Sequence, residues 1–446
     1  DLSWHVIRTY IKGMSLEPGE PLEPEDYASL PQKRRTVTLE TYERVYSRVY
    51  ESWYRLLGEE GYWDDQDLAH ALLEEGIQPR FPAIFCDEAQ DFTPLELEVL
   101  YRLSIFSDRS LHGYLSQRVP FVFAGDPFQT LNPTGFSWDA IKANYTTKLL
   151  DNSNPDDGSS RQINYRELEY NYRSTWPIVK FSNTLQAMRS RLLDVTLAPQ
   201  SAWSNGEAAQ NPLWYDRADE SVAEQLRRQT ELTIIVPVDE GEEAAFVKSD
   251  PLLSKVVEKD EHDTPMNVLS PMRAKGLEFR RVALYGFGAA APASLMTLID
   301  NPEEMTPEEA LPFEYFINRL YVAASRPKRR LFVIDSADSL TRFWDFARSD
   351  AKLQEFTQRL KNARAWQGKL GILQQGLPEA WQGEREDQGE VADKLRNEGF
   401  NNRDPYLLRQ AALQFEAAGS ALKAKECRAA AFEMEGATEK AARACL

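Results

Sequence analysis

The sequence predicts an α/β fold with parallel strands, followed by a purely helical region. Five short apolar runs predict the strands: residues 83–86, 119–125, 232–238, 281–287 and 330–335. Each run is bounded by polar or turn residues and separated from the next by a stretch at helical spacing, as in parallel strands covered on both faces. Strand patterns then end near residue 340, and the rest of the chain has a helical pattern.

The composition is that of a folded protein. Hydrophobic residues make up 42% and aromatic residues 11% of the 446 residues, which leaves room for roughly two to four domains. No run approaches the roughly 18 apolar residues of a membrane span, and no signal peptide opens the chain, so we expect a soluble cytoplasmic protein without membrane contact. Cys86, Cys427 and Cys445 are too few and too scattered for a disulfide framework or a zinc site.

The chain is acidic, with a formal net charge of −18. This charge argues against general adhesion to nucleic acid, because phosphate contacts need a basic surface. It leaves room for a local basic groove. The simplest interpretation of the acidity is a solvated surface that aids solubility.

Residues 1–80 alternate apolar and charged residues at helical spacing. Residues 38–61 predict an amphipathic helix. Its broad apolar face comprises Tyr42, Val45, Tyr46, Val49, Tyr50 and Trp53. Residues 62–76 predict a second helix, capped by one of its aspartates and closed near Gly76.

Two later segments are rich in turn residues. We expect residues 197–212 and 237–250 to form loops or edge elements. Residues 341–403 are expected to be a helical linker region.

Residues 404–446 carry an internal repeat. Phe415 matches Phe432 and Gly419 matches Gly436, at an offset of 17 residues. Small residues, an aromatic and a glycine at fixed phase suit stacked helices that turn at the glycine. The pattern resembles a tetratricopeptide-type repeat, which implies a protein partner and an array continuing past the end of this chain. The alternative is a simple alanine-rich helical hairpin.

Polar clusters follow the predicted strands. Asp87 and Glu88 end the first strand, where an aspartate can hold Mg²⁺ and a glutamate can activate water. Asp126 and Gln129 end the second, and a side-chain amide there can sense a phosphate. Taken alone, the first cluster could equally be the acidic start of a helix.

Three further clusters are suited to a nucleotide. Tyr172 offers an aromatic face beside Arg173, whose guanidinium matches phosphate oxygens. Lys275 and Glu278 precede a strand. Arg326 ends a predicted helix, from which an arginine can stabilise charge in phosphoryl transfer.

In order, the segments DEAQD, GDPFQ, NYRST, AKGLEF and YVAASRP resemble motifs II to VI of superfamily 1 helicases of the UvrD, Rep and PcrA type. The resemblance covers roughly residues 60–335. It implies two RecA-like P-loop NTPase lobes: a helical insertion at 1–80, the incomplete first lobe at 81–190 and the second lobe at 191–340. It also implies an ATP-dependent enzyme that moves 3′ to 5′ on single-stranded DNA, with single-stranded RNA as the alternative.

The resemblance also implies roles for individual residues. Asp87 would serve Mg²⁺ and Glu88 would be the general base. The other catalytic residues implied are Gln129, Arg173 and Arg326, and the other residues implied to bind ATP are Tyr172, Glu278, Asp126 and Lys275.

Two motif regions depart from the family pattern. The resemblance implies nucleic-acid contacts by Ser270 and Arg273 in motif V, where Ser270 and Met272 stand in place of the family's usual threonine and histidine. After motif III, Phe136 and Trp138 could stack on bases or anchor a core. Only about 95 residues separate motifs IV and V, so the large second-lobe insertion is absent or reduced, which favours translocation over duplex unwinding.

The phosphate-binding loop G-x-x-x-x-G-K-S/T does not occur in the sequence. In the family it precedes the helical insertion, so we expect it upstream of Asp1 and expect this chain alone to lack ATPase activity. The alternative is a naturally loop-less relative that acts as a non-catalytic protein or nucleic-acid interaction module.

Overall fold

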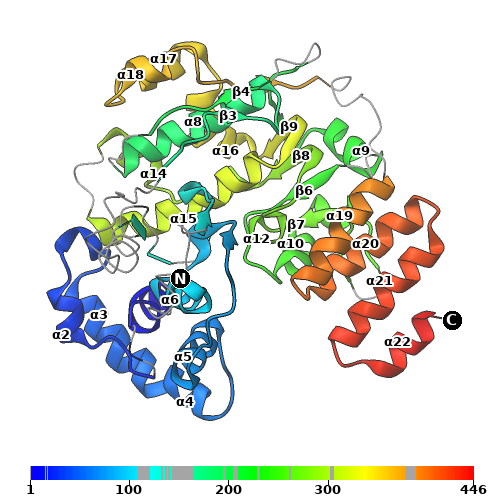
Figure 1. The fold of residues 1–446 in the computed structure, drawn as a ribbon. Helices are drawn as coiled ribbons and strands as arrows, with labels where there is room; N and C mark the ends of the chain where they lie inside the picture. Colours follow the sequence, from blue (N-terminus) through cyan, green and yellow to red (C-terminus); the bar gives the residue numbers. More distant parts are fainter. Residues whose placement is uncertain are drawn as a thin grey trace. The chain divides into compact units, whose positions relative to one another are not determined.

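The computed structural model describes residues 2–15, 17, 19–107, 121–131, 134–135, 138, 141–142, 164–193, 197–203, 209–228, 232–260, 263–301, 306–377 and 388–445 (Figure 1). The chain divides into two compact units. Unit 1 comprises Asp1–Glu167 and Met305–Asn318, and unit 2 comprises Leu168–Glu304 and Arg319–Leu446.

Unit 1 is mainly helical at its N-terminal end. Its helices are α1 (Leu2–Val6, continued by a π-helix at Ile7–Lys12), α2 (Pro24–Ser29), α3 (Leu39–Val45, continued by a π-helix at Tyr46–Tyr54), α4 (Arg55–Glu59), α5 (Asp65–Glu75) and α6 (Pro94–Leu103). Tyrosines fill the core, and the rings of Tyr27 and Tyr42 stack with centroids 4.0 Å apart. Buried tyrosines need partners for their hydroxyls, and Tyr27 donates to the carbonyl of Val37 at 2.8 Å.

The helix expected at residues 38–61 is confirmed, with one difference. Tyr42, Val45, Tyr46 and Tyr50 are buried, but Trp53 is 57% exposed. The π-helical hydrogen bonding of Tyr46–Tyr54 makes each turn wider than an α-turn. The apolar face predicted at α-helical spacing therefore loses its phase before Trp53.

The second predicted helix is confirmed as α5. Asp64 is its N-cap, and its Oδ1 accepts hydrogen bonds from the amides of Gln66 and Asp67. In the other direction, Asp67 Oδ2 accepts from the amide of Asp64. This reciprocal pair is a capping box. Gly76 follows with φ of 84°, a backbone conformation that glycine adopts readily.

The described strands of unit 1 form one parallel pair. β1 (Ile84–Cys86) lies beside β2 (Phe121–Phe123), with Ile84 opposite Phe121 and Cys86 opposite Phe123. Short 3₁₀ turns follow both strands, at Ala89–Asp91 and Pro127–Gln129. The ends of both strands therefore lie at the same edge.

Unit 2 contains a six-stranded parallel sheet in the order β10-β5-β9-β8-β6-β7. Its strands are β5 (Leu213–Asp216), β6 (Thr233–Ile235), β7 (Val268–Leu269), β8 (Phe279–Tyr285), β9 (Pro327–Asp335) and β10 (Gln374–Gln375). A further parallel pair joins β3 (Tyr170–Asn171) and β4 (Ser201–Ala202). The predicted α/β class with parallel strands is confirmed, and each of the five predicted apolar runs overlaps a strand.

Two local expectations were wrong. The segment 237–250, expected as a loop or edge, contains helix α10 (Glu243–Ser249), because Glu243 and Val247 are buried on one face. Strands were expected to end near 340, yet β10 pairs with β5 at the edge of the sheet. Two polar residues held by a neighbouring strand give no periodic signal.

Unit 2 contains nine further helices among the described residues, of which α8 and α13 contact β9 and α12 contacts β7. They are α8 (Trp176–Leu192), α9 (Glu220–Arg228), α11 (Leu253–Val256), α12 (Pro271–Ala274), α13 (Phe287–Ala290), α14 (Leu295–Asp300), α16 (Ala337–Arg342), α17 (Asp350–Gln358) and α18 (Ala363–Trp366). Helix α15 (Pro307–Ala324) is divided between the units after Asn318. One core cluster joins β5, β6 and β8 to α9, α10 and α11, with Val222 and Val247 fully buried.

The last four helices of unit 2 follow one another directly in the chain. They are α19 (Gln388–Asn401), α20 (Pro405–Ala417), α21 (Ala421–Met434) and α22 (Thr438–Cys445), drawn in orange and red in Figure 1. The turns fall at the two matched glycines, Gly419 with φ of 74° and Gly436 with φ of 73°. The repeat also recurs in side-chain contacts. Lys423 lies 5.0 Å from the ring centre of Phe415, and Lys440 lies 5.9 Å from that of Phe432.

Helix α20 covers the edge of the sheet at β7. Tyr406 and Gln410 each donate to the carbonyl of Val268 at 2.8 Å. An uncovered edge strand offers its backbone groups to other chains, so α20 protects this edge. The stacked helices expected at 404–446 are thus an integral part of unit 2.

The compact units divide the chain differently from the predicted lobes. Residues 168–190, predicted with the first lobe, belong to unit 2, because β3 pairs with β4 and α8 packs on β9. Residues 305–318, predicted with the second lobe, belong to unit 1, where Tyr315 is hydrogen-bonded to His5 at 2.5 Å. Over the ranges given above, no helix combines the length and apolar character needed to cross a membrane.

Candidate functional site

In unit 1, the structure brings four predicted site residues to one edge of the β1–β2 pair. Asp87 and Glu88 follow β1, while Asp126 and Gln129 follow β2. Gln90, which is fully buried, links the two sets. Its Nε2 donates to Glu88 Oε2 at 2.5 Å, and its Oε1 accepts from the amide of Asp126 at 3.0 Å.

Sequence reasoning gave Gln90 no role. Its buried position between two carboxylate-bearing strand ends identifies it as the positioning residue of this edge. The sequence signal that could have identified Gln90 was its position as a polar residue inside the DEAQD segment. Gln129 is held on the same edge by its own bond, from Nε2 to Asp126 Oδ2 at 3.0 Å.

Glu88 has a left-handed backbone, with φ of 51°. This conformation costs a non-glycine residue roughly 1–2 kcal/mol and is concentrated at functional sites. The neighbouring backbone holds it in place: the Ala89 amide donates to the carbonyl of Ala124 at 2.8 Å, and the Asp91 amide donates to that of Glu88 at 2.9 Å.

Asp87 is exposed, and its Oδ1 accepts from the Glu88 amide at 2.9 Å. Among the residues that the structure describes, no group of three or more His, Cys, Asp or Glu side chains could hold a metal ion. One exposed carboxylate nevertheless suits Mg²⁺, which keeps several waters and takes other ligands from substrate phosphates. Asp87 is therefore compatible with its predicted role.

Gly125 allows the two strand ends to approach. A Cβ atom at this position would lie 2.5 Å from Gln90 Oε1 and 3.1 Å from the Ala89 amide nitrogen. We expect Gly125→Ala to displace Gln90 and destabilise unit 1 by about 1–3 kcal/mol. Hydrogen exchange of the Asp126 amide, which donates to Gln90, should accelerate.

Gly58→Ala is the matched control, because a Cβ there meets no atom within 4 Å. It should leave exchange of the Asp126 amide close to wild type and, because alanine replaces a glycine inside α4, should stabilise unit 1 by at most about 1 kcal/mol. Unchanged exchange at Asp126 in Gly125→Ala would refute the role assigned to Gln90.

The aromatics after motif III have different outcomes. Phe136 lies outside the described residues. Trp138 is partly buried against a core cluster that includes Leu97 and Ile141, and its ring meets Tyr165 edge-on at 6.2 Å. This packing favours the core-anchor alternative, and base stacking by Trp138 stays a prediction.

In unit 2, Arg173 and Glu278 form an ion pair, with Arg173 Nε 2.5 Å from Glu278 Oε1. Asn171 fixes the turn before it, because its Oδ1 accepts from the amides of Arg173 and Ser174. Lys328, which sequence reasoning missed, binds the other oxygen of Glu278 at 2.9 Å. Burial opposes ionisation of Glu278, but Arg173 and Lys328 outweigh it and lower its pKa to about 2.

Arg326 joins this cluster from a buried position. It is 1% exposed, and its guanidinium donates to the carbonyl of Val322 and to Ser325 Oγ. Arg173 in turn donates to the carbonyl of Ser325 at 3.3 Å. The structure thus brings together three predicted residues, Arg173, Glu278 and Arg326. The side chain of Tyr172, also predicted to bind ATP, is 68% exposed.

The other motif V residues, Ser270, Arg273 and Lys275, lie on or beside α12, away from the Glu278 cluster. Ser270 is fully buried and caps the helix, its Oγ accepting from the amide of Arg273 at 3.4 Å. Lys275 is partly buried at the C-terminal end of the same helix.

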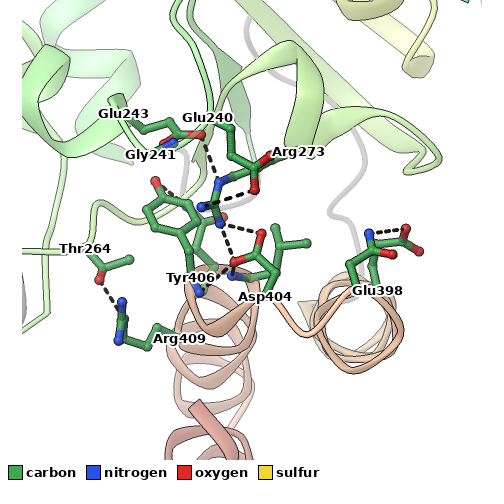
Figure 2. A network of polar contacts seen from close by, with 12 residues as sticks. Glu240, Gly241, Glu243, Thr264, Arg273, Glu398, Asp404, Tyr406 and Arg409 are labelled. Atoms are coloured by element: carbon green, nitrogen blue, oxygen red, sulfur yellow. Dashed lines mark hydrogen bonds and ion pairs between the residues drawn. The ribbon is translucent and has the colours of Figure 1, made fainter. Parts of the chain in front are cut away.

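Arg273 is bound within the protein by carboxylates (Figure 2). Its Nη1 lies 2.5 Å from Asp404, its Nε 3.2 Å from Glu243 and its Nη2 3.5 Å from Glu240. The ring of Tyr406 lies 4.1 Å from the guanidinium carbon. Contact between Arg273 and nucleic acid stays a prediction, and it requires phosphate to compete with these partners.

Asp404 and Glu243 are held by more than the arginine. Asp404 caps α20 and accepts from the Tyr406 amide at 2.8 Å, and Glu243 accepts from the Gly241 amide at 2.9 Å. Burial, together with the charges of Asp404 and Glu243, raises the pKa of Glu240 even though Arg273 opposes this. The network therefore joins α10, α12 and α20.

Comparison with known proteins does not assign this chain to a family. No family model matches the sequence, and no curated protein matches it closely enough to count as a relative.

Proposed function

We propose that this chain carries most of the motor of a superfamily 1, UvrD-like ATP-dependent helicase or translocase that acts on single-stranded nucleic acid. The observation that carries the proposal is the β1–β2 edge. There Gln90 ties Glu88 to the Asp126 backbone while Glu88 keeps a left-handed conformation. Five ordered motifs resembling those of the family support it.

Each unit supplies groups suited to phosphoryl transfer. In unit 1, Glu88 would accept the proton of the attacking water, and Gln90 would fix the direction of its carboxylate. Asp87 would hold Mg²⁺, which neutralises phosphate charge when bound. In unit 2, Arg173 is pre-positioned by Glu278, and an arginine so held can bind phosphate oxygens.

Arg326 is proposed as the arginine that stabilises the transition state. Its burial has a consequence for testing this role. Because Arg326 bonds the carbonyl of Val322 and Ser325 Oγ, its alanine variant should lose stability as well as activity, so Glu88 is the cleaner test.

Movement on DNA or RNA rests on the resemblance. Ser270 and Arg273 are engaged inside unit 2, and the chain is acidic. The proposal includes a protein partner at the C-terminal helices and single-stranded nucleic acid as the track, and contact through Ser270 or Arg273 requires phosphate to compete with their partners inside unit 2.

The pattern G-x-x-x-x-G-K-S/T does not occur in residues 1–446, so the proposed motor requires a phosphate loop supplied by additional sequence. We expect residues 1–446 alone to show negligible DNA-stimulated ATP hydrolysis. The complete protein encoded by the parent reading frame should hydrolyse ATP, and Glu88→Gln should lower turnover by about 10²–10⁴-fold. Nucleotide binding should persist in that variant.

Glu75→Gln is the matched control, an exposed glutamate at the end of α5. It should leave turnover unchanged. A parent protein without a phosphate loop, or hydrolysis that does not depend on Glu88, would refute the motor and favour a non-catalytic interaction module.

A further inference from the structure

Helix α20 docks on the β7 edge of the sheet through polar side chains. Tyr406, Gln410 and Gln414 recur at every fourth position and therefore share one face of the helix. Tyr406 and Gln410 donate to the carbonyl of Val268, and Gln414 Nε2 donates to Asn267 Oδ1. Hydrogen bonds, rather than aliphatic packing, hold this face of α20 on the sheet.

The aliphatic side of α20 includes Leu408, which faces α19. Leu408 is fully buried, and a Cβ atom at Gly399 of α19 would lie 2.9 Å from its Cγ. The apolar cluster that joins β5, β6 and β8 to α9, α10 and α11 contains no residue of α20. Parts of a chain that meet through polar contacts commonly move relative to one another. The contact at β7 is therefore one that can open and close.

The same docking captures Arg273 (Figure 2). Both carboxylate oxygens of Asp404, the N-cap of α20, accept from Arg273 Nη1 at 2.5 Å, and the ring of Tyr406 covers the guanidinium. Glu243, which belongs to α10, binds Nε of the same guanidinium at 3.2 Å. Opening α20 would therefore remove Asp404 and Tyr406 from Arg273 and leave Glu243 in place.

A guanidinium binds the oxygens of a carboxylate and those of a phosphate with the same N–H groups. With α20 docked, Asp404 occupies these groups, and the Arg273 side chain is 10% exposed. We propose that α20 is an inhibitory clamp, in which Asp404 competes with a phosphate of single-stranded nucleic acid for Arg273. Docking of the C-terminal helices lowers the affinity of unit 2 for the strand, and a protein that displaces them raises it. The inference deepens the proposed function by adding its regulation, and it rests on that function for the nature of the ligand.

The test is equilibrium binding of a single-stranded oligodeoxythymidylate to residues 1–446, followed by the fluorescence anisotropy of the labelled strand. Asp404→Asn keeps an oxygen that can cap α20 and removes the charge that holds Arg273. It should tighten binding about tenfold, because one charge-assisted contact with phosphate is gained. The slope of log affinity against log salt concentration should steepen by about 0.7 for that contact. Gln410→Ala weakens docking without touching Arg273 and should tighten binding in the same direction.

Glu416→Gln is the matched control. It removes the same charge from the same helix, at a side chain that is 43% exposed and paired with Arg428, and it should leave binding close to wild type. If Asp404→Asn binds no tighter than Glu416→Gln, or gains affinity with an unchanged salt slope, the clamp is overturned.

Coupling between two binding events is reciprocal, so the bound strand should loosen α20 in wild type. The amide of Tyr406, which donates to Asp404 at 2.8 Å, should exchange its hydrogen faster when the oligonucleotide is bound. Unchanged or slower exchange contradicts the clamp. Failure of wild type and all variants to bind the strand also overturns it, whereas Glu88-dependent hydrolysis in the complete protein decides the proposed function separately.

Discussion

Replacing Arg273 by alanine is expected to lower the free energy of unfolding of unit 2 by about 3–5 kcal/mol, because it leaves buried charges without a partner. Glu243 is fully buried and Asp404 is 7% exposed. Both bind this one guanidinium, which also packs on Tyr406. The loss should concentrate where α10, α12 and α20 meet.

Denaturant unfolding followed by hydrogen exchange in α12 and α20 measures this effect. Arg428→Ala is the control, since Arg428 and its partner Glu416 are largely surface residues of the helical array. An exposed pair contributes at most about 1 kcal/mol. A comparably small loss for Arg273→Ala would show that the network does not hold α20 on the sheet.

Acidification is expected to destabilise unit 1 through His5. His5 is 5% exposed and hydrogen-bonded to Tyr315 and Thr36. Burial lowers its pKa from 6.5 to about 4, so the unfolded chain binds a proton more readily than the folded one. The contribution of His5 is therefore fully present above about pH 6.5 and is lost as the pH falls toward 4, by on the order of 3 kcal/mol.

Urea unfolding of wild type and His5→Asn across this pH range isolates the contribution. His70 also has a burial-lowered pKa, but it is present in both proteins and cancels in the difference. The variant should be less stable at neutral pH and should lose less stability on acidification. Parallel stability curves for the two proteins would refute the assignment to His5.

The strands most visible in the sequence were those with long apolar runs. β8 and β9 are buried on both faces, and Val282, Leu284 and Val333 are fully buried. Such strands produce continuous apolar signals. β7 and β10 are two residues long and exist because a neighbouring strand pairs with them, so no local pattern predicts them.

The candidate site also contains residues with a local sequence signal and residues without one. Asp87 and Glu88 could be selected from the sequence because carboxylates at a strand end suggest metal and water chemistry. The link made by Gln90, the shared partner Lys328 and the capture of Arg273 by Asp404 join residues 36, 50 and 131 positions apart in the chain. No local spacing encodes such contacts.

The sequence by itself determined the α/β class, the helical repeat with its turning glycines, and the order of the chemical motifs. These depend on periodicity and on residue type, which are local properties of the chain. Only the tertiary structure decided which charged groups neutralise one another and which aromatics stay in solvent. Arg273 and Tyr172 illustrate the reason: their surroundings are built from distant segments, and burial against those segments determines whether a side chain is available to a ligand.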